Sequence, residues 1–117
     1  MSKKDIANVL AILDAIDQIK KYTENVIDAD AFYQNRIVFD ATLMNFVLIG
    51  EMTERLSDEL KNKATHIEWQ KIKGFRNMIA HDYLGIDAEE VWQIIADDLY
   101  PFRTDVQKII NKLQQDR

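Results

Sequence analysis

The sequence has no cysteine, so it can form no disulfide bond and offers no thiolate ligand for a zinc site. Such a composition does not depend on an oxidising compartment, and we expect a cytoplasmic protein. No stretch approaches about 18 uncharged apolar residues, the length that a membrane-spanning helix requires. The first residues, Met1 to Asp5, also lack the apolar run and cleavage site of a secretory signal. We therefore expect neither a membrane span nor secretion.

Breakpoints are scarce as well, because the 117 residues include only three glycines and one proline. We find no internal repeat, low-complexity tract or flexible linker that would divide the chain. At this length, residues 1–117 are expected to form a single domain. Apolar residues recur at spacings of three and four, which is typical of amphipathic helices. These features predict an all-α fold in which four or five helices pack as an antiparallel bundle.

The first half of the chain predicts two helices. Ser2 is a candidate cap for the first helix, which should run to about Thr23. Asp28 or Asp30 is a candidate cap for the second. The apolar side of that second helix continues to Leu60, which gives a length of roughly 45 Å at 1.5 Å per residue. It would be long enough to cross the whole domain.

The second half predicts shorter helices. Thr65 to Glu68 has the pattern of a capping box that opens a third helix, and Gly85 marks the end of that helix. Asp87 to Glu90 resembles another capping box, which opens a fourth helix. Pro101 must either kink the fourth helix or begin a fifth, because proline cannot donate a hydrogen bond to the preceding turn.

Positive charge is in short supply, and the net charge is −5. This balance argues against a protein that coats nucleic acid in general, because an acidic surface repels the phosphate backbone, and we expect no DNA partner. Residues 61–81 are the exception, where a single glutamate accompanies five basic residues: Lys61, Lys63, Lys71, Lys73 and Arg76. A lysine cluster taken alone is usually a solvated face.

Arg76 falls on the core side of the predicted third helix. With about 100° of rotation per residue, it lies among Trp69, Ile72, Ile79, Ala80 and Tyr83. An arginine in that position is costly unless a carboxylate meets its planar guanidinium group. The second helix offers Glu51, so we predict an ion pair between Arg76 and Glu51. Asp40 and Glu54 are weaker candidates for the same role.

Asn77 and His81 are four residues apart and share a different stripe of the third helix, together with Gln70 and Gly74. A glycine inside a helix costs about 1 kcal/mol relative to alanine, which is understandable if another backbone must approach closely there. The simplest candidate is the same helix of a second subunit. In a two-fold homodimer one patch meets itself, so two copies of His81 would come together across the axis.

The segment Arg76-Asn77-Met78-Ile79-Ala80-His81-Asp82-Tyr83 resembles the arginine, four residues, histidine motif of HEPN-domain ribonucleases. It has the Arg-Asn form, with the additional His-x-Tyr of the HepT toxins. Gly50 to Leu56 is similar to the Gly-Glu-Ala segment of that family's second helix, although Met52 stands where alanine is common. Trp69 to Ile95 is similar to the family's tryptophan, motif and following helix. The resemblance covers most of the chain, least over the first 25 residues, and implies a HEPN-like bundle.

The resemblance implies that the chain cleaves RNA without a metal, at a site formed across a homodimer and with cyclic phosphate ends as products. His81 would act as the acid or base, because histidine is the side chain suited to both proton roles near neutral pH. Arg76 would stabilise charge on the phosphate or hold the site in place. Asn77 would orient His81 or the phosphate. The chain itself would need no cofactor.

Tyr83 acquires a separate role from the same resemblance. HepT toxins are paired with an MntA-like nucleotidyltransferase antitoxin that transfers AMP to the tyrosine of the His-x-Tyr motif, using ATP and magnesium. The added negative charge beside the cleavage site would repel the RNA phosphate. On a continuous helix Tyr83 would point about 160° away from His81. Both side chains therefore border one site only if the helix ends before Gly85.

A second interpretation is a catalytically inactive helical module that binds a nucleotide or a partner protein. Each motif residue also has an ordinary structural role: His81 as a helix C-terminal cap, Arg76 as a structural ion pair and Tyr83 as a core residue. Trp69 and Trp92 are expected to be packing residues rather than a platform for RNA bases. His66 is expected to be a surface residue. Adjacent His81 and Asp82 are poor evidence for a metal site, and we expect none.

Overall fold

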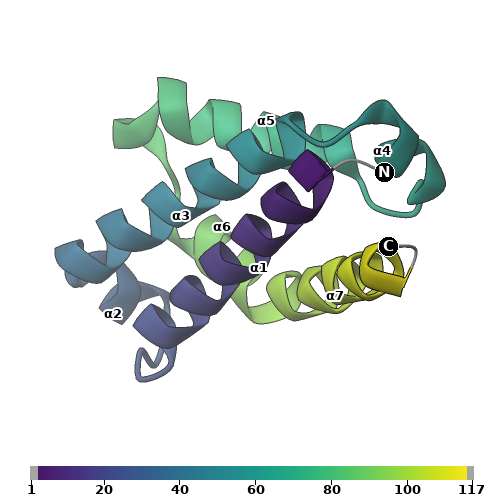
Figure 1. The fold of residues 1–117 in the computed structure, drawn as a ribbon. Helices are drawn as coiled ribbons and strands as arrows, with labels where there is room; N and C mark the ends of the chain where they lie inside the picture. The colour runs from purple at the N-terminus through teal and green to yellow at the C-terminus, as the bar shows by residue number, and fades with distance from the viewer. Residues whose placement is uncertain (1–2, 116–117) are drawn as a thin grey trace.

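All of the regular secondary structure is helical in the computed structural model, which describes residues 3–115 (Figure 1). Within those residues the chain forms seven α-helices and one short 3-10 helix and has no β-strand. The elements in chain order are α1 (Lys3–Thr23), α2 (Ala29–Gln34), α3 (Arg36–Glu54), α4 (Asp58–Lys63), α5 (Trp69–His81), η1 (Tyr83–Gly85), α6 (Ala88–Asp97) and α7 (Leu99–Gln115). The predicted all-α fold is confirmed.

The long helices pack against one another in antiparallel pairs, as predicted. α1 lies between α3 and α7 (Figure 1). Near the start of α1, the Asp5 carboxylate accepts a 2.9 Å hydrogen bond from the backbone of Ser57, just beyond the end of α3. Near the other end of α1, Arg103 of α7 donates two hydrogen bonds to Asp17, of 2.7 and 3.1 Å. The Arg103 guanidinium group lowers the pKa of the Asp17 carboxyl below its ordinary value.

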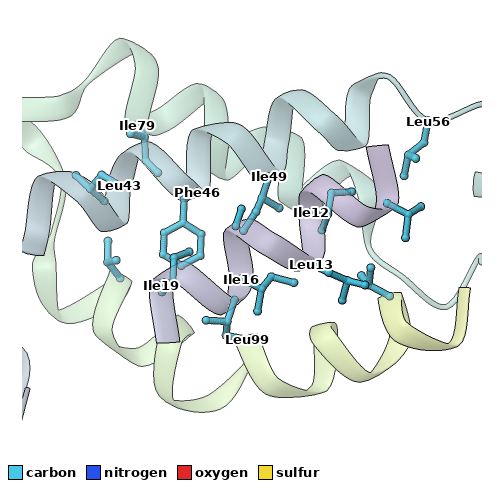
Figure 2. Close-up of a cluster of buried hydrophobic side chains, with 14 of the residues drawn as sticks. Ile12, Leu13, Ile16, Ile19, Leu43, Phe46, Ile49, Leu56, Ile79 and Leu99 are labelled. Carbon is cyan, nitrogen blue, oxygen red and sulfur yellow. The ribbon is translucent and has the colours of Figure 1, made fainter. Parts of the chain in front are cut away.

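The core is a continuous cluster of apolar side chains contributed by all seven of the α-helices described. Figure 2 shows Ile16 and Ile19 of α1 facing Phe46 and Ile49 of α3, with Leu99 of α7 nearby. Burying each large aliphatic or aromatic side chain stabilises the fold by about 1.5 to 3 kcal/mol. The largest apolar side chains with essentially no exposure are Phe32, Ile12, Ile16, Ile19, Leu60 and Ile110. This core holds α3 and α5 in the positions that the site requires.

The predicted single helix from Asp30 to Leu60 is wrong, because the chain divides there into α2, α3 and α4. Asn35 interrupts the first part, and its side chain caps α3 by accepting a 3.2 Å hydrogen bond from the backbone of Val38. Ser57 interrupts the second part by capping α4 in the same way. The Ser57 hydroxyl also donates to Asp5, 52 residues away, so a tertiary contact holds this break in place.

Both predicted ends of the third helix also need correction. The Thr65 capping box does not form, and α5 begins at Trp69 after Glu68, which makes no side-chain cap. A turn that buries Ile67 takes its place, with the Ile67 backbone donating to the carbonyl of Ala64. At the other end, α5 stops at His81, four residues before Gly85.

The remaining caps follow the predictions where the structure describes them. Asp28 caps α2 by accepting a 2.9 Å hydrogen bond from Ala31, and Asp87 caps α6. Pro101 lies in the first turn of α7, where the missing N–H costs least, so it begins a fifth long helix rather than kinking the fourth. Ser2 lies outside the described residues.

Between residues 3 and 115, no helix combines the length and the apolar character needed to cross a membrane.

Candidate active site

The site is organised by the place where α5 crosses α3, at Gly50 and Arg76. A Cβ atom added to Gly50 would overlap the Cβ and Cγ atoms of Arg76. Gly50 is therefore required by the arginine of the neighbouring helix, which lies flat against the bare backbone. The rings of Phe46 and Phe75 meet edge to face beside this crossing, with centroids 5.1 Å apart. This packing sets the distance between the two helices.

Arg76 is held by carboxylates from α3. One terminal nitrogen donates to Glu51, which confirms the predicted contact, and the other donates to Glu54 at 3.1 Å. The Arg76 side chain is 15% exposed, whereas that of Glu51 is 43% exposed. The Nε atom of Arg76 is buried and has no hydrogen-bond partner among residues 3–115. Lys73, one turn earlier on α5, also pairs with Glu54 at 3.3 Å.

The stripe of α5 that carries Asn77 and His81 faces away from the core. His81 is exposed and Asn77 is half-buried, and neither side chain has a hydrogen bond or ion pair with any of the described residues. A Cβ atom added to Gly74 would have no neighbour within 4 Å. Ala80, which we expected on the core side, is exposed instead. His81 is thus open to solvent and Asn77 partly so, on the helix that also carries the firmly held Arg76.

The chain turns sharply directly after His81. The backbone of Asp82 donates a 2.9 Å hydrogen bond to the carbonyl of Met78, and the backbone of Gly85 donates to the carbonyl of Asp82 at 3.0 Å. A side chain at Gly85 would collide with the Asp82 carboxylate. The α-helix therefore ends before Tyr83, which satisfies the condition for His81 and Tyr83 to border one site.

Tyr83 is part of a polar cluster that the sequence did not reveal. Its hydroxyl donates a hydrogen bond to Asp40 of α3. The Arg36 guanidinium group lies 5.7 Å from the centre of the Tyr83 ring, and its Nε lies 3.6 Å from Asp40. Asp40, a weaker candidate for Arg76, thus serves Tyr83 instead. The spacing of Arg36 and Asp40, four residues apart on one helix, was the available signal.

The hydrogen bond to Asp40 raises the pKa of the Tyr83 hydroxyl above its ordinary value, and partial desolvation acts in the same direction. The positive charge of Arg36 opposes both effects only in part. A phenol that donates to a carboxylate loses a favourable contact when it ionises, and two negative charges then repel each other. Tyr83 therefore remains a neutral donor near neutral pH.

The remaining residues considered in the sequence, Trp69, Trp92 and His66, lie in the core or on the surface. Trp69 packs on the core and donates a 3.2 Å hydrogen bond from Nε1 to the carbonyl of Ala64, which confirms a packing role. Trp92 packs near Phe32, with ring centroids 5.5 Å apart. His66 is exposed and lies 3.7 Å from Asp105. No group of three or more potential metal-binding side chains occurs in the part of the chain that the structure describes.

The fold and site together define an all-α protein with an arginine and a histidine presented by one helix of an antiparallel bundle. The sequence profile of the family described as ribonuclease HepT-like matches residues 12–110. This chain therefore belongs to the HepT-like ribonuclease family. No solved structure is close enough to the chain to count as a match.

Individual relatives carry ribonuclease names. A putative RNase of Methanocaldococcus jannaschii is 28% identical over 108 residues, covering 92% of this chain and 98% of that protein. A probable ribonuclease HepT of Thermococcus cleftensis is 22% identical over 98 residues, covering 84% and 88%. A third relative, named gamma-glutamylcyclotransferase and putative RNase, also from Methanocaldococcus jannaschii, is 27% identical over 98% of this chain. The chain spans about half of that longer protein, 52% of its length.

Proposed function

We propose that this chain is a metal-independent endoribonuclease and the toxin of a toxin–antitoxin pair, with a cleavage site formed across a homodimer. The observation that carries the proposal is the contrast on α5 between neighbouring motif residues. Arg76 is fixed by Glu51 and Glu54, whereas Asn77 and His81 are turned outward without partners among residues 3–115. The ion pairs give Arg76 a structural role. Asn77 and His81 have no such role, which favours a functional one.

The chemistry uses groups that RNA and histidine already provide. The 2′-hydroxyl of RNA attacks the adjacent phosphorus, the bond from phosphorus to the 5′-oxygen breaks, and a cyclic phosphate forms. One imidazole accepts the 2′-hydroxyl proton, and a second donates a proton to the departing 5′-oxygen. Each chain supplies one histidine in the motif, so two copies of His81 from two chains provide both roles. In this scheme Asn77 orients an imidazole or a phosphate oxygen.

Exposed apolar side chains on α3 and an open position on α5 support a homodimer. Met44 and Leu48 of α3 are 59% and 43% exposed, and they precede Glu51 by seven and three residues on the outer side of the helix. Apolar side chains exposed beside one another commonly mark an interface. Gly74 leaves room for a second backbone on α5. Two-fold pairing of this face would cover the apolar side chains and bring the two His81 residues together.

Arg76 acts in this proposal mainly as a positioning residue. Both of its terminal nitrogens are engaged by carboxylates, and its Nε is buried. A guanidinium group in this state holds α5 against α3 and fixes the direction of the motif stripe. It also contributes positive charge close to the phosphate, reduced by the two glutamates.

Regulation in the proposal acts at Tyr83. An MntA-like nucleotidyltransferase antitoxin transfers AMP from ATP, with magnesium, to the Tyr83 hydroxyl. The half-buried ring follows His81 by two residues, after the helix has ended. A phosphodiester there places negative charge and bulk beside the groove that the RNA would occupy.

The test is cleavage of an RNA oligonucleotide by the purified chain with EDTA present. We expect cutting that leaves a cyclic phosphate, and no cutting at a position where the 2′-hydroxyl is replaced by hydrogen. His81→Ala should abolish cleavage and change the stability by less than about 0.5 kcal/mol, because the side chain is exposed. His66→Ala, which changes the other histidine, is the matched control. Binding of RNA without any cleavage would favour the inactive binding module instead.

A further inference from the structure

We propose that Asp40 is the base that accepts the Tyr83 proton when a nucleotidyl group is transferred to Tyr83, and that Arg36 then binds the new phosphate. The inference rests on the proposed function in taking Tyr83 as the modified residue. It adds that the toxin itself carries the base for its own modification, so the partner enzyme need only bind and align the nucleotide.

The contact between Asp40 and Tyr83 has the geometry of a nucleophile and its base. The Tyr83 hydroxyl donates directly to Oδ1 of Asp40. Asp40 is in α3 and Tyr83 is in η1, so the hydrogen bond joins residues that are 43 positions apart in the sequence. About half of the Asp40 side chain remains exposed, which leaves a route for the accepted proton to reach solvent. Both groups are accessible to a partner at the surface.

The atoms balance in a single displacement. The Tyr83 oxygen attacks the α-phosphorus of a nucleoside triphosphate, and a bond forms between oxygen and phosphorus. The bond between the α-phosphorus and the bridging oxygen breaks, and pyrophosphate leaves with the magnesium ion that the partner supplies. The phenolic proton moves to Asp40 and from there to water. A carboxylate that accepts the proton of an attacking hydroxyl is also the arrangement used by protein kinases.

The protonation state of Tyr83 agrees with a proton transfer to Asp40 that accompanies the attack on phosphorus. Because the neighbouring carboxylate disfavours the ionised phenol, Tyr83 carries its proton until the attack begins. The proton must therefore leave as the new bond forms. Asp40 is the acceptor already in contact with it.

Arg36 is placed to bind the product. Its guanidinium group lies over the rings of Tyr83 and Tyr33, at 5.7 and 5.8 Å from their centres, and is exposed. It is paired with Asp40 before transfer, at 3.6 Å. Protonation of Asp40 weakens that pair as the phosphodiester appears next to it. Arginine binds phosphate oxygens through parallel hydrogen bonds, so the guanidinium group can move from carboxylate to phosphate.

A first experiment needs no partner protein. The full chain is treated with N-acetylimidazole at neutral pH, and acetylation of Tyr83 is followed by peptide mass spectrometry, with Tyr100 as an internal reference. We expect Asp40→Asn to slow acetylation of Tyr83 by at least about tenfold, once the rate is corrected for the lower Tyr83 pKa of that variant, because asparagine can keep the hydrogen bond but cannot take the proton. Asp30→Asn is the matched control. Equal or faster acetylation in Asp40→Asn would overturn the role of Asp40 as a base.

A second experiment uses an MntA-like nucleotidyltransferase antitoxin, the partner named in the proposed function, with ATP and magnesium. The wild-type chain should gain AMP on Tyr83, and Asp40→Asn should gain it about 100-fold more slowly with little change in KM for the chain. Arg36→Gln should also slow the reaction, and Arg36→Lys should recover part of the rate. If the wild-type chain gains no AMP while acetylation still depends on Asp40, the proposed modification of Tyr83 by AMP is wrong. Asp40 would still be shown to act as a base toward Tyr83. Equal rates in wild type and Asp40→Asn overturn this inference alone.

Discussion

Arg76 lies directly against the backbone of Gly50, and this contact joins the two helices that carry the site. The glycine allows α5 to approach α3 closely, and the approach brings the guanidinium group to Glu51 and Glu54. A residue that makes no side-chain contact of its own thus determines where the motif helix lies. The outward direction of Asn77 and His81 follows from that placement.

Gly50→Ala should lower stability by about 1 to 3 kcal/mol, because the added methyl group would overlap Arg76 and force the helices apart. Urea unfolding of the purified chain measures the loss. The same variant should cleave RNA more slowly, since the motif helix is displaced. Unchanged unfolding would show that the crossing tolerates a side chain and would contradict the role given to Gly50.

Gly74→Ala tests the open face of α5. Within a protomer the new methyl group meets nothing within 4 Å, and replacing a helical glycine should stabilise the fold by up to about 1 kcal/mol. In the proposed homodimer the same methyl group lies at the interface. We expect sedimentation to show weaker self-association together with unchanged or higher protomer stability. Unaltered association would place the interface elsewhere.

Arg76→Ala should destabilise the chain by about 1 to 3 kcal/mol, less than a fully buried pair, because the glutamates remain partly exposed. Glu51→Gln and Glu54→Gln should each cost less than about 1 kcal/mol, since one carboxylate remains for Arg76. Thermal unfolding of the three variants decides the point. If the arginine variant melts like wild type, the pair does not hold α5 in place.

The Tyr83 hydroxyl should titrate above its ordinary value of 10.0. A group whose pKa is raised by folding adds stability that is present below the unfolded pKa and lost as pH rises through the folded pKa. The contact with Asp40 should therefore weaken only in strongly alkaline solution. Absorbance titration, with Tyr83→Phe subtracted, should show a lower pKa in Asp40→Asn. The same or a higher value in that variant would mean that Asp40 does not control Tyr83.

Local patterns predicted the fold wherever local forces decide it. The apolar spacing of α1 and the caps at Asp28 and Asp87 are properties of neighbouring residues, and they appear as predicted. The break at Ser57 is different, because Asp5, near the start of α1 and 52 residues away, holds it. An apolar stripe cannot reveal such a contact, so the second helix was predicted as one long element.

The site shows the same division. The cost of burying a guanidinium group was enough to predict that Arg76 meets Glu51. The contact of Tyr83 with Asp40 was missed, because it depends on where α5 ends. That end is set by the turn from Asp82 to Gly85, whereas the sequence pattern suggested a helix that continued to Gly85.

Cleavage by mixtures of wild-type and His81→Ala chains, refolded together with EDTA present, tests the shared site most directly. If both imidazoles of a dimer are needed, activity should fall as the square of the wild-type fraction, so that half wild type gives about a quarter of full activity. Activity that falls in direct proportion to the wild-type fraction would mean that each chain holds a complete site. That result, or a wild-type chain that cuts no RNA at all, would contradict the proposal.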